Sequence, residues 1–344
     1  MSKATKSILL IYTGGTIGMI NNPESQTLIP VDFNEISNQL PELRRFECLI
    51  ESYTFDPTID SSNVNPEFWS KLAELIRDKY SQFDGFVILH GTDTMSFTAS
   101  ALSFMLGNLD KPVILTGSQL PIGVLRTDGK ENLLTAIEIA ADQKDGQAIV
   151  PEVCIFFQDR LFRGNRTTKH NAEYFHAFRS HNYPALADTG IHINYHHTAI
   201  QYPDKKLPLA VHTKMDPHVG ILKIFPGISR EWLYSCLHTP GLKGIIMESY
   251  GSGNAPTNKW FLEELQDAIN RNIIILNITQ CQTGTVEPGK YETNRHIHEM
   301  GVLNGRDITT ESALTKFMFL LGKGLQTRDI RLYLNRSLCG EISL

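Results

Sequence analysis

Short apolar runs of strand length alternate along this chain with segments of helical periodicity, and this alternation constrains the fold more than any other feature. The apolar runs of the first half are Ile8–Ile11, Phe86–Leu89, Val113–Leu115 and Val153–Phe157. Amphipathic stretches lie between them at Pro66–Tyr80, Ser96–Leu106 and Gly129–Ala141. Such alternation is typical of βαβ units, so we expect an α/β fold with a mostly parallel, Rossmann-like sheet.

The pattern changes between residues 182 and 217, where Pro, His, Asn, Tyr and Lys are frequent and helical periodicity is lost. We expect β-ribbon or irregular chain there, ending in a linker. A second α/β set follows, with strands at Val219–Phe225, Gly244–Met247 and Ile273–Ile278 and helices at Ser229–Leu237, Asn258–Asn270 and Ser312–Lys323. The predicted organisation is a larger N-terminal α/β domain at 1–204, a linker at 205–217 and a smaller C-terminal α/β domain at 218–344.

Composition excludes several classes of protein. The 344 residues are 41% apolar and 20% charged, which is ordinary for a globular protein, and the net charge of −5 gives no sign of affinity for nucleic acid or membranes. The longest apolar runs are strand-sized, and the first residues lack a secretory signal, so we expect a cytoplasmic protein. Five scattered cysteines without a C-x-x-C pair argue against a disulfide framework or a zinc site.

A glycine-rich turn follows the first apolar run. Gly14, Gly15 and Gly18 surround Thr16, and glycines let a chain turn sharply and let a ligand approach the backbone. Ligands of open α/β sheets bind at the carboxyl ends of strands, so Thr16 is a candidate nucleophile. A tight turn without chemistry is equally compatible with this segment. A dinucleotide fingerprint is disfavoured, because the glycine order departs from G-x-G-x-x-G and Asp32 comes too early.

The segment from Phe83 to Met95 repeats this arrangement. A buried strand ends at Gly91, and the polar run Thr92-Asp93-Thr94 leads into a helix. A carboxylate is favoured near a helix N-terminus. A second hydroxyl beside a carboxylate, at the carboxyl end of a strand, suits acyl-transfer chemistry.

Taken together, these motifs resemble the L-asparaginase family, specifically its bacterial cytoplasmic (type I) branch. The resemblance covers essentially the whole chain, and the two threonine motifs in this order are highly specific. The matching stretches are Thr13–Met19, His90–Met95, Thr116–Gln119, Arg163–Lys169, Ser249–Pro256 and Thr279–Cys281.

The resemblance implies an amidohydrolase that converts L-asparagine to L-aspartate and ammonia. Thr16 would attack the side-chain amide carbon and form an acyl-enzyme, and its β-branching helps to hold the hydroxyl in position. Thr92, Lys169 and Asp93 are similar to the family's proton-transfer set. A lysine can act as a base only when its ammonium is easily deprotonated, and burial promotes this. The N-terminal domain would then be the catalytic one.

Substrate contacts are also implied by the resemblance. Ser61 and Ser62 match the positions that hold the α-carboxylate of the substrate, and Asp60, Gly15 and Gly91 are expected to line the same site. Asp93 would bind the α-amino group, and the backbone N–H of Thr92 would stabilise the oxyanion. The family needs no metal or organic cofactor. It forms homodimers or homotetramers, and glutamine is expected to be at most a weak substrate.

Structural roles compete with these assignments when the residues are read singly. Ser61 and Ser62 could cap the turn before the helix at Pro66, Asp93 could be a plain helix cap, and Lys169 could be a solvated surface lysine. The histidines of the middle segment do not lie at ligand spacing on one element, and we expect them to be surface or strand residues: His192, His196, His197, His212 and His218.

The chain departs from the family pattern at the loop after the first motif. The family places a tyrosine there that closes over the substrate, whereas Leu28 occupies that position and no tyrosine occurs between Thr13 and Ser52. The segment Ile20–Thr27 is polar and rich in turn residues, as expected of a lid. The group that activates Thr16 is therefore an open question.

A second departure concerns regulation. Some type I enzymes bind asparagine at an allosteric site through an arginine just before the Ser-Tyr-Gly stretch, and Glu248 stands at that position here. A carboxylate repels the carboxylate of the ligand. Thr168 and Cys281 match other residues near that site. We predict that this form of asparagine activation is absent.

Two other functions are compatible with the motifs. A catalytically weak homologue that binds or senses an amino acid would explain the missing tyrosine. The glutaminase-like subunit of a tRNA-dependent amidotransferase shares the core motifs, but that family carries an additional N-terminal domain, whereas this sequence begins close to the first strand. Ammonia release from asparagine distinguishes the enzyme from the sensor.

Overall fold

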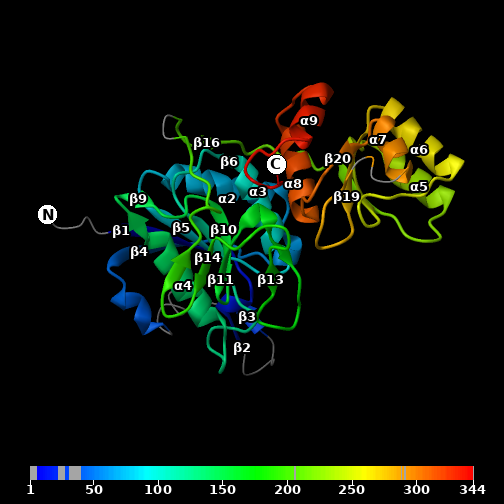
Figure 1. Cartoon of the computed structure of the whole chain (residues 1–344). Helices are drawn as coiled ribbons and strands as arrows, with labels where there is room; N and C mark the ends of the chain where they lie inside the picture. The colour runs from blue at the N-terminus through cyan, green and yellow to red at the C-terminus, as the bar shows by residue number, and fades with distance from the viewer. Residues whose placement is uncertain are drawn as a thin grey trace. The chain divides into compact units, whose positions relative to one another are not determined.

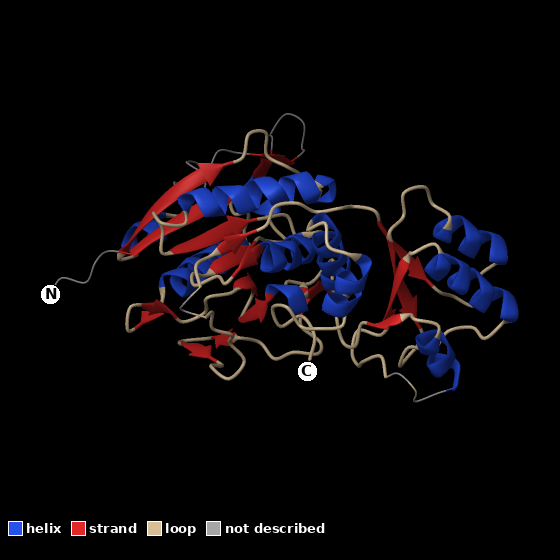
Figure 2. Ribbon diagram, turned by 90° about the horizontal axis from the view of Figure 1, so that it is seen from above, coloured by secondary structure: helices blue, strands red, loops and turns tan. Residues whose placement is uncertain are grey.

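The computed structural model describes residues 6–21, 28–30, 40–204, 207–287, 289 and 292–343. The chain divides into two compact units, Met1–Thr213 and Lys214–Leu344 (Figures 1 and 2). This division falls inside the predicted linker at 205–217. The predicted domain limits of 1–204 and 218–344 stay a prediction.

The first unit is built on an eight-stranded sheet in the order β15-β14-β11-β10-β7-β5-β1-β4. Its parallel part confirms the expected fold class and consists of β4 (Cys48–Thr54), β1 (Lys6–Tyr12), β5 (Gly85–Leu89), β7 (Val113–Thr116) and β10 (Val153–Phe157). Three antiparallel strands extend it: β11 (Arg160–Arg163), β14 (Ala187–Thr189) and β15 (Ile193–Tyr195). The β14–β15 pair is the ribbon expected in the middle segment.

Strand register brings the two glycine-containing threonine motifs to one edge of this sheet. Tyr12 pairs with Leu89, and Leu89 pairs with Thr116, so β1, β5 and β7 end side by side. The carboxyl ends of parallel strands are where α/β sheets place their ligands. The two motifs follow β1 and β5 directly and therefore emerge at this edge.

Helices cover both faces of the parallel strands (Figure 1). α4 (Gly129–Ala141) packs its apolar side against Ile8, Leu10 and Tyr12 of β1. Successive side chains of a strand point to opposite faces, so Leu9 and Ile11 face the other side, and both are buried. α2 (Pro66–Lys79) and α3 (Met95–Met105) pack against each other, and α3 contacts β7 and β10. Burial on both faces explains why these strands read as continuous apolar runs.

Short elements complete the first unit. Its 3₁₀ turns are η1 (Thr16–Gly18), η2 (Pro41–Arg45), η3 (Ser61–Asn63) and η4 (Gly164–Arg166). Its two-stranded pairs are β2 (Met19–Asn21) with β3 (Leu28–Pro30), β6 (Leu106–Gly107) with β16 (Ala210–Val211), β8 (Gln143–Lys144) with β9 (Gln147–Ala148), and β12 (Thr168–Lys169) with β13 (Phe178–Arg179). Residues 22–27 of the predicted lid lie outside the described residues.

The second unit holds a parallel sheet of four strands, which confirms the α/β class predicted for the smaller domain and adds β20 to the three predicted strands. Its strands are β17 (Val219–Lys223), β18 (Gly244–Ser249), β19 (Ile274–Thr279) and β20 (Leu303–Asn304). Its helices are α5 (Arg230–Leu237), α6 (Lys259–Asn270), α7 (Glu292–Glu299), α8 (Thr310–Gly322) and α9 (Thr327–Leu334). Across the described residues of both units, no helix has the length and apolarity needed to cross a membrane.

A buried ion pair anchors the last residues of the second unit. Lys316 of α8 and Glu341 are both fully buried, and their Nζ and Oε1 atoms lie 2.6 Å apart. The Lys316 ammonium also donates to the carbonyls of Leu334 and Arg336. The Glu341 carboxylate accepts further hydrogen bonds from backbone N–H groups, including that of Leu338. Each charge therefore has several partners, as buried charges require.

We predict that Lys316→Met lowers the free energy of unfolding by about 3–5 kcal/mol, because it leaves the Glu341 carboxylate buried without its counter-charge. Chemical denaturation followed by circular dichroism measures the change. The control is Lys259→Met, which removes a lysine of the same unit whose side chain is 91% exposed and should cost well under 1 kcal/mol. Equal losses in the two variants would contradict the prediction.

Candidate active site

The two threonine motifs are joined directly by backbone hydrogen bonds. The Thr13 N–H donates to the carbonyl of Leu89 at 3.0 Å, and the Thr13 hydroxyl donates to the same oxygen at 2.8 Å. The Ile59 N–H donates to the Thr13 carbonyl at 2.8 Å. The end of β5 and the segments that follow β1 and β4, which are far apart in the sequence, therefore meet at one point.

The glycines of the motifs allow this meeting. Gly14 and Gly15 have φ angles of +131° and +91°, a region that side chains disfavour. A methyl carbon built on Gly15 would lie 2.6 Å from the Cα of Gly91, and one built on Gly91 would lie 2.5 Å from the Ser61 hydroxyl. The backbones of the two motifs are thus in contact, and Ser61 also packs against Gly91.

Thr16 opens the turn η1 and is only partly buried. Within the described residues, its hydroxyl has no hydrogen-bond partner. Tyr12 fixes the turn, because its hydroxyl donates to the Gly18 carbonyl at 3.0 Å. Burial raises the pKa of Tyr12 to about 12. Tyr12 therefore holds the turn through a buried phenol.

Lys169 joins the second motif from β12. Its Nζ atom lies 2.8 Å from the Thr92 hydroxyl and 2.7 Å from Oδ1 of Asp93. The lysine side chain is 18% exposed, whereas that of Asp93 is 65% exposed and can still bind other groups. Lys169 is thus no solvated surface lysine. The Thr92 hydroxyl also contacts Oε1 of Gln119 at 3.4 Å, a residue for which the sequence alone predicts no role in the site.

Asp60 and its neighbours form a separate turn beside Gly91. Oδ1 of Asp60 accepts from the Ser62 N–H at 2.8 Å and from the Ser62 hydroxyl at 2.7 Å, and these bonds lower the pKa of Asp60. The carbonyl of the buried Ser61 accepts from the Thr94 hydroxyl at 2.6 Å. This bond ties the turn to the second motif.

The structure corrects the capping alternatives. The cap of the turn before Pro66 is Asp60, whose carboxylate accepts from the Ser62 N–H, and not a serine. Asn65 caps α2 by accepting from the N–H of Phe68 at 3.0 Å. Thr94 is the N-cap position of α3, and the Asp93 carboxylate turns to Lys169 instead. The site residues predicted from sequence thus lie on one edge, and the contacts of Lys169 with Thr92 and Asp93 are not capping contacts.

Of the two residues that depart from the family pattern, Leu28 and Glu248, only Glu248 has a described side chain. Leu28 begins β3, but its side chain lies outside the described residues. Glu248 lies at the end of β18 in the second unit, with a side chain 13% exposed. Its carboxylate accepts from the Thr310 hydroxyl at 2.7 Å and lies 3.8 Å from the ammonium of Lys223. Glu248 is therefore bound by residues of its own unit.

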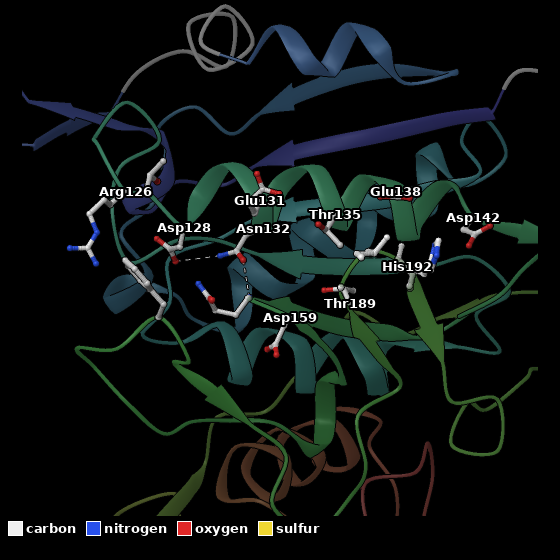
Figure 3. Close-up of a pocket in the computed structure, with 16 residues that line it drawn as sticks. Arg126, Asp128, Glu131, Asn132, Thr135, Glu138, Asp142, Asp159, Thr189 and His192 are labelled. Carbon is white, nitrogen blue, oxygen red and sulfur yellow. Dashed lines mark hydrogen bonds between the residues drawn. The ribbon is translucent and has the colours of Figure 1, made fainter.

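A cavity of about 620 Å³ lies in the first unit, lined along α4 by Glu131, Thr135 and Glu138 and across from it by Asp159 and Thr189 (Figure 3). None of the site residues predicted from sequence lines this cavity. The cavity is thus distinct from the edge that gathers the two threonine motifs.

Among the described residues, no group of three or more His, Cys, Asp or Glu side chains is placed to hold a metal ion.

Comparison with known families shows which family the chain belongs to. The family description "Asparaginase, N-terminal" matches residues 7–201, and "Glutaminase/Asparaginase C-terminal domain" matches residues 218–334. The chain belongs to the asparaginase family. This confirms the family and the enzyme class that the paired threonine motifs predict.

Individual relatives support this assignment over the full length. The chain is 47% identical to L-asparaginase 1 of Escherichia coli (strain K12), covering 98% of both chains. It is 40% identical to the 60 kDa lysophospholipase of Mus musculus, covering 98% of this chain and 63% of that protein. Among solved structures, L-asparaginase I from Vibrio cholerae O1 biovar eltor matches with a TM-score of 0.90 and 39% identity, covering 99% of this chain and 100% of that one.

The contact between the two motifs predicts that Gly15→Ala is more destabilising than a glycine-to-alanine change at an open turn. Gly146 is the matched control, because its φ of +78° carries similar backbone strain but nothing lies within 4 Å of an added methyl carbon. We expect Gly146→Ala to cost about 1–3 kcal/mol of unfolding free energy from strain alone. Gly15→Ala should cost clearly more, because the Gly91 backbone must also move. Urea denaturation measures both, and equal costs would refute the contact.

Proposed function

We propose that this chain hydrolyses L-asparagine to L-aspartate and ammonia through an acyl-enzyme on Thr16. The observation that carries the proposal is the pair of short contacts from Lys169 to Thr92 and Asp93, on the edge where Gly15 packs against Gly91. The full-length similarity to L-asparaginases supports asparagine hydrolysis over the other functions.

In the first half-reaction, the Thr16 hydroxyl attacks the side-chain amide carbon of asparagine. An ester bond forms to Oγ, the C–N bond breaks, and the hydroxyl proton leaves with the nitrogen as ammonia. Negative charge develops on the amide oxygen in the transition state, and a preorganised N–H donor there stabilises it strongly. The Thr92 N–H has no partner among the described residues and is our candidate for that donor.

In the second half-reaction, water attacks the ester and releases aspartate. The water proton must be taken up while the Thr16 hydroxyl is restored. Thr92 and Lys169 offer a path, since their side chains are in hydrogen-bond contact at 2.8 Å. Lys169 serves as the base when its amine is neutral, and Asp93 fixes its orientation. With leucine at position 28, we assign the activation of Thr16 to this set.

Substrate recognition follows from the remaining groups of the edge. The buried Ser61, which lies beside Gly91, and its neighbour Ser62, which donates to Asp60, would receive the α-carboxylate. The exposed carboxylate of Asp93 would receive the α-ammonium group. We expect asparagine to be preferred over glutamine, and we propose a homodimer or homotetramer as the active assembly.

Thr16→Ala should lower kcat for asparagine by a factor on the order of 10⁴ or more, because the ester cannot form without the hydroxyl. Ammonia release, measured by a coupled dehydrogenase assay, reports the rate on asparagine and on glutamine. Thr16→Ser is the matched variant, because it keeps the hydroxyl and loses only the β-methyl group. It should retain measurable turnover.

The same pair of variants separates the alternatives. Equal, negligible turnover of the wild type and Thr16→Ala, with asparagine still bound by both in calorimetry, would favour the amino-acid sensor. Glutamine turnover well above asparagine turnover would favour a glutaminase role. Either outcome would refute the proposed reaction.

Asparagine should not activate the enzyme through a second site. Because Glu248 places a bound carboxylate where an activating asparagine would need a cation, the rate should depend hyperbolically on asparagine concentration. Initial rates over a thousandfold range of asparagine should give a Hill coefficient of about 1. A sigmoidal curve that becomes hyperbolic in Thr168→Ala or Cys281→Ala would contradict the prediction.

A further inference from the structure

A chain of hydrogen bonds runs behind the Gly91–Thr92 peptide through three buried side chains that the proposed chemistry does not use. Trp69 lies on α2, Thr98 lies on α3, and His90 follows β5. The Trp69 indole N–H donates to the Thr98 hydroxyl oxygen at 3.0 Å, and that hydroxyl lies 2.9 Å from Nε2 of His90. Nδ1 of His90 lies 2.7 Å from the carbonyl oxygen of Gly91.

The Gly91 carbonyl, at the end of this series of hydrogen bonds, fixes the position of every proton in the series. A carbonyl oxygen can only accept, so Nδ1 of His90 carries the hydrogen. The ring is neutral near pH 7, since burial lowers the pKa of His90 to about 4, and Nε2 is therefore the bare nitrogen. Thr98 must then donate to Nε2 and accept from the indole N–H, which is only a donor. No other arrangement satisfies all three side chains.

The bond to the Gly91 carbonyl determines the direction of the next N–H group. The peptide group is planar and trans, so the carbonyl of Gly91 and the N–H of Thr92 point to opposite sides of one rigid plane. Fixing the carbonyl on the interior side directs the Thr92 N–H away from His90. That N–H has no partner among the described residues, and it belongs to the residue that Lys169 contacts.

Gly91 makes such a restraint necessary. Only glycine fits between Gly15 and the Ser61 hydroxyl, because an added methyl carbon would lie 2.5 Å from that oxygen. Glycine is also the residue whose backbone is least restricted by its own side chain. The peptide that follows it needs an external partner to hold one orientation, and a preorganised donor is effective only when it does not reorient during the reaction.

We infer that His90 is a positioning residue, whose Nδ1–H holds the Gly91 carbonyl and thereby aims the Thr92 N–H at the oxyanion of the reaction. The Trp69–Thr98 pair supports this tautomer, because the Thr98 hydroxyl donates to the bare Nε2, and it holds the orientation of the imidazole. The inference rests on the proposed function for its oxyanion, while the hydrogen-bond chain itself does not.

Two substitutions at His90 separate the role of each ring nitrogen. Asparagine places its amide nitrogen near the position of Nδ1, whereas glutamine places its amide near the position of Nε2. His90→Gln, which loses the donor to Gly91, should lower kcat about 10²-fold with KM changed less than about threefold, as for the loss of one oxyanion donor. His90→Asn should retain at least about ten times more kcat than His90→Gln. Similar losses in the two variants, or a rise in KM alone, would overturn the inference.

A second pair of variants changes Thr98, the hydrogen-bond partner of the His90 imidazole. Thr98→Val keeps the shape of the side chain but removes the hydroxyl, whereas Thr98→Ser keeps the hydroxyl. We expect Thr98→Val to lower kcat about tenfold and Thr98→Ser to stay within about threefold of the wild type. This pair tests the positioning role of His90 if His90→Gln does not fold. A kcat for Thr98→Val equal to that of Thr98→Ser would contradict that role.

Nitrogen NMR of protein labelled with ¹⁵N-histidine tests the chain without any turnover. The chain has 12 histidines, and the His90 signals are those absent from His90→Asn. We expect a protonated Nδ1 and a bare Nε2 from pH 5 to 9, with the Nε2 signal shifted in Thr98→Val. A protonated Nε2 would overturn the inference. A wild type with the expected spectrum but no asparagine turnover would instead refute the proposed function.

Discussion

The approach of Gly15 to Gly91 is the constraint on which the rest of the site depends. The two glycines follow neighbouring parallel strands, β1 and β5, and no side chain fits between their backbones. This contact sets the distance between the two threonines that carry the proposed chemistry. It also leaves both turns with glycine backbones, which need support from elsewhere: Tyr12 holds the first turn through Gly18, and His90 holds the second through the Gly91 carbonyl.

The two charged side chains of the site, Lys169 and Asp93, differ in their exposure to solvent. Lys169 is mostly buried and reaches both Thr92 and Asp93, while the Asp93 carboxylate remains largely exposed. An ammonium between a hydroxyl and a carboxylate is well placed to exchange protons with the first and to be oriented by the second. In the proposed reaction, the exposed carboxylate receives the cationic group of the substrate. One lysine would then link the proposed acyl-transfer residues to substrate recognition.

The parallel core could be predicted well from sequence, because strands buried on both faces read as continuous apolar runs and their helices read as amphipathic stretches. β4 was missed, since this edge strand carries exposed Leu49 and Tyr53 and has no such pattern. Of the candidate site, the paired motifs predicted Thr16, Thr92 and Asp93, and the resemblance to the family added Lys169. The supporting contacts were beyond sequence reasoning, because Trp69, Thr98 and His90 come from three elements and only their packing shows that one chain of hydrogen bonds joins them.

The indole of Trp69 gives the site an intrinsic optical reporter. The chain has three tryptophans, and the other two, Trp232 and Trp260, belong to the second unit. Trp69 is almost fully buried, and two hydrogen bonds link its N–H to the imidazole of His90. With the other two indoles replaced by phenylalanine, fluorescence from the remaining one would report on the first unit alone, so the order of the candidate site could be followed in solution while asparagine is present.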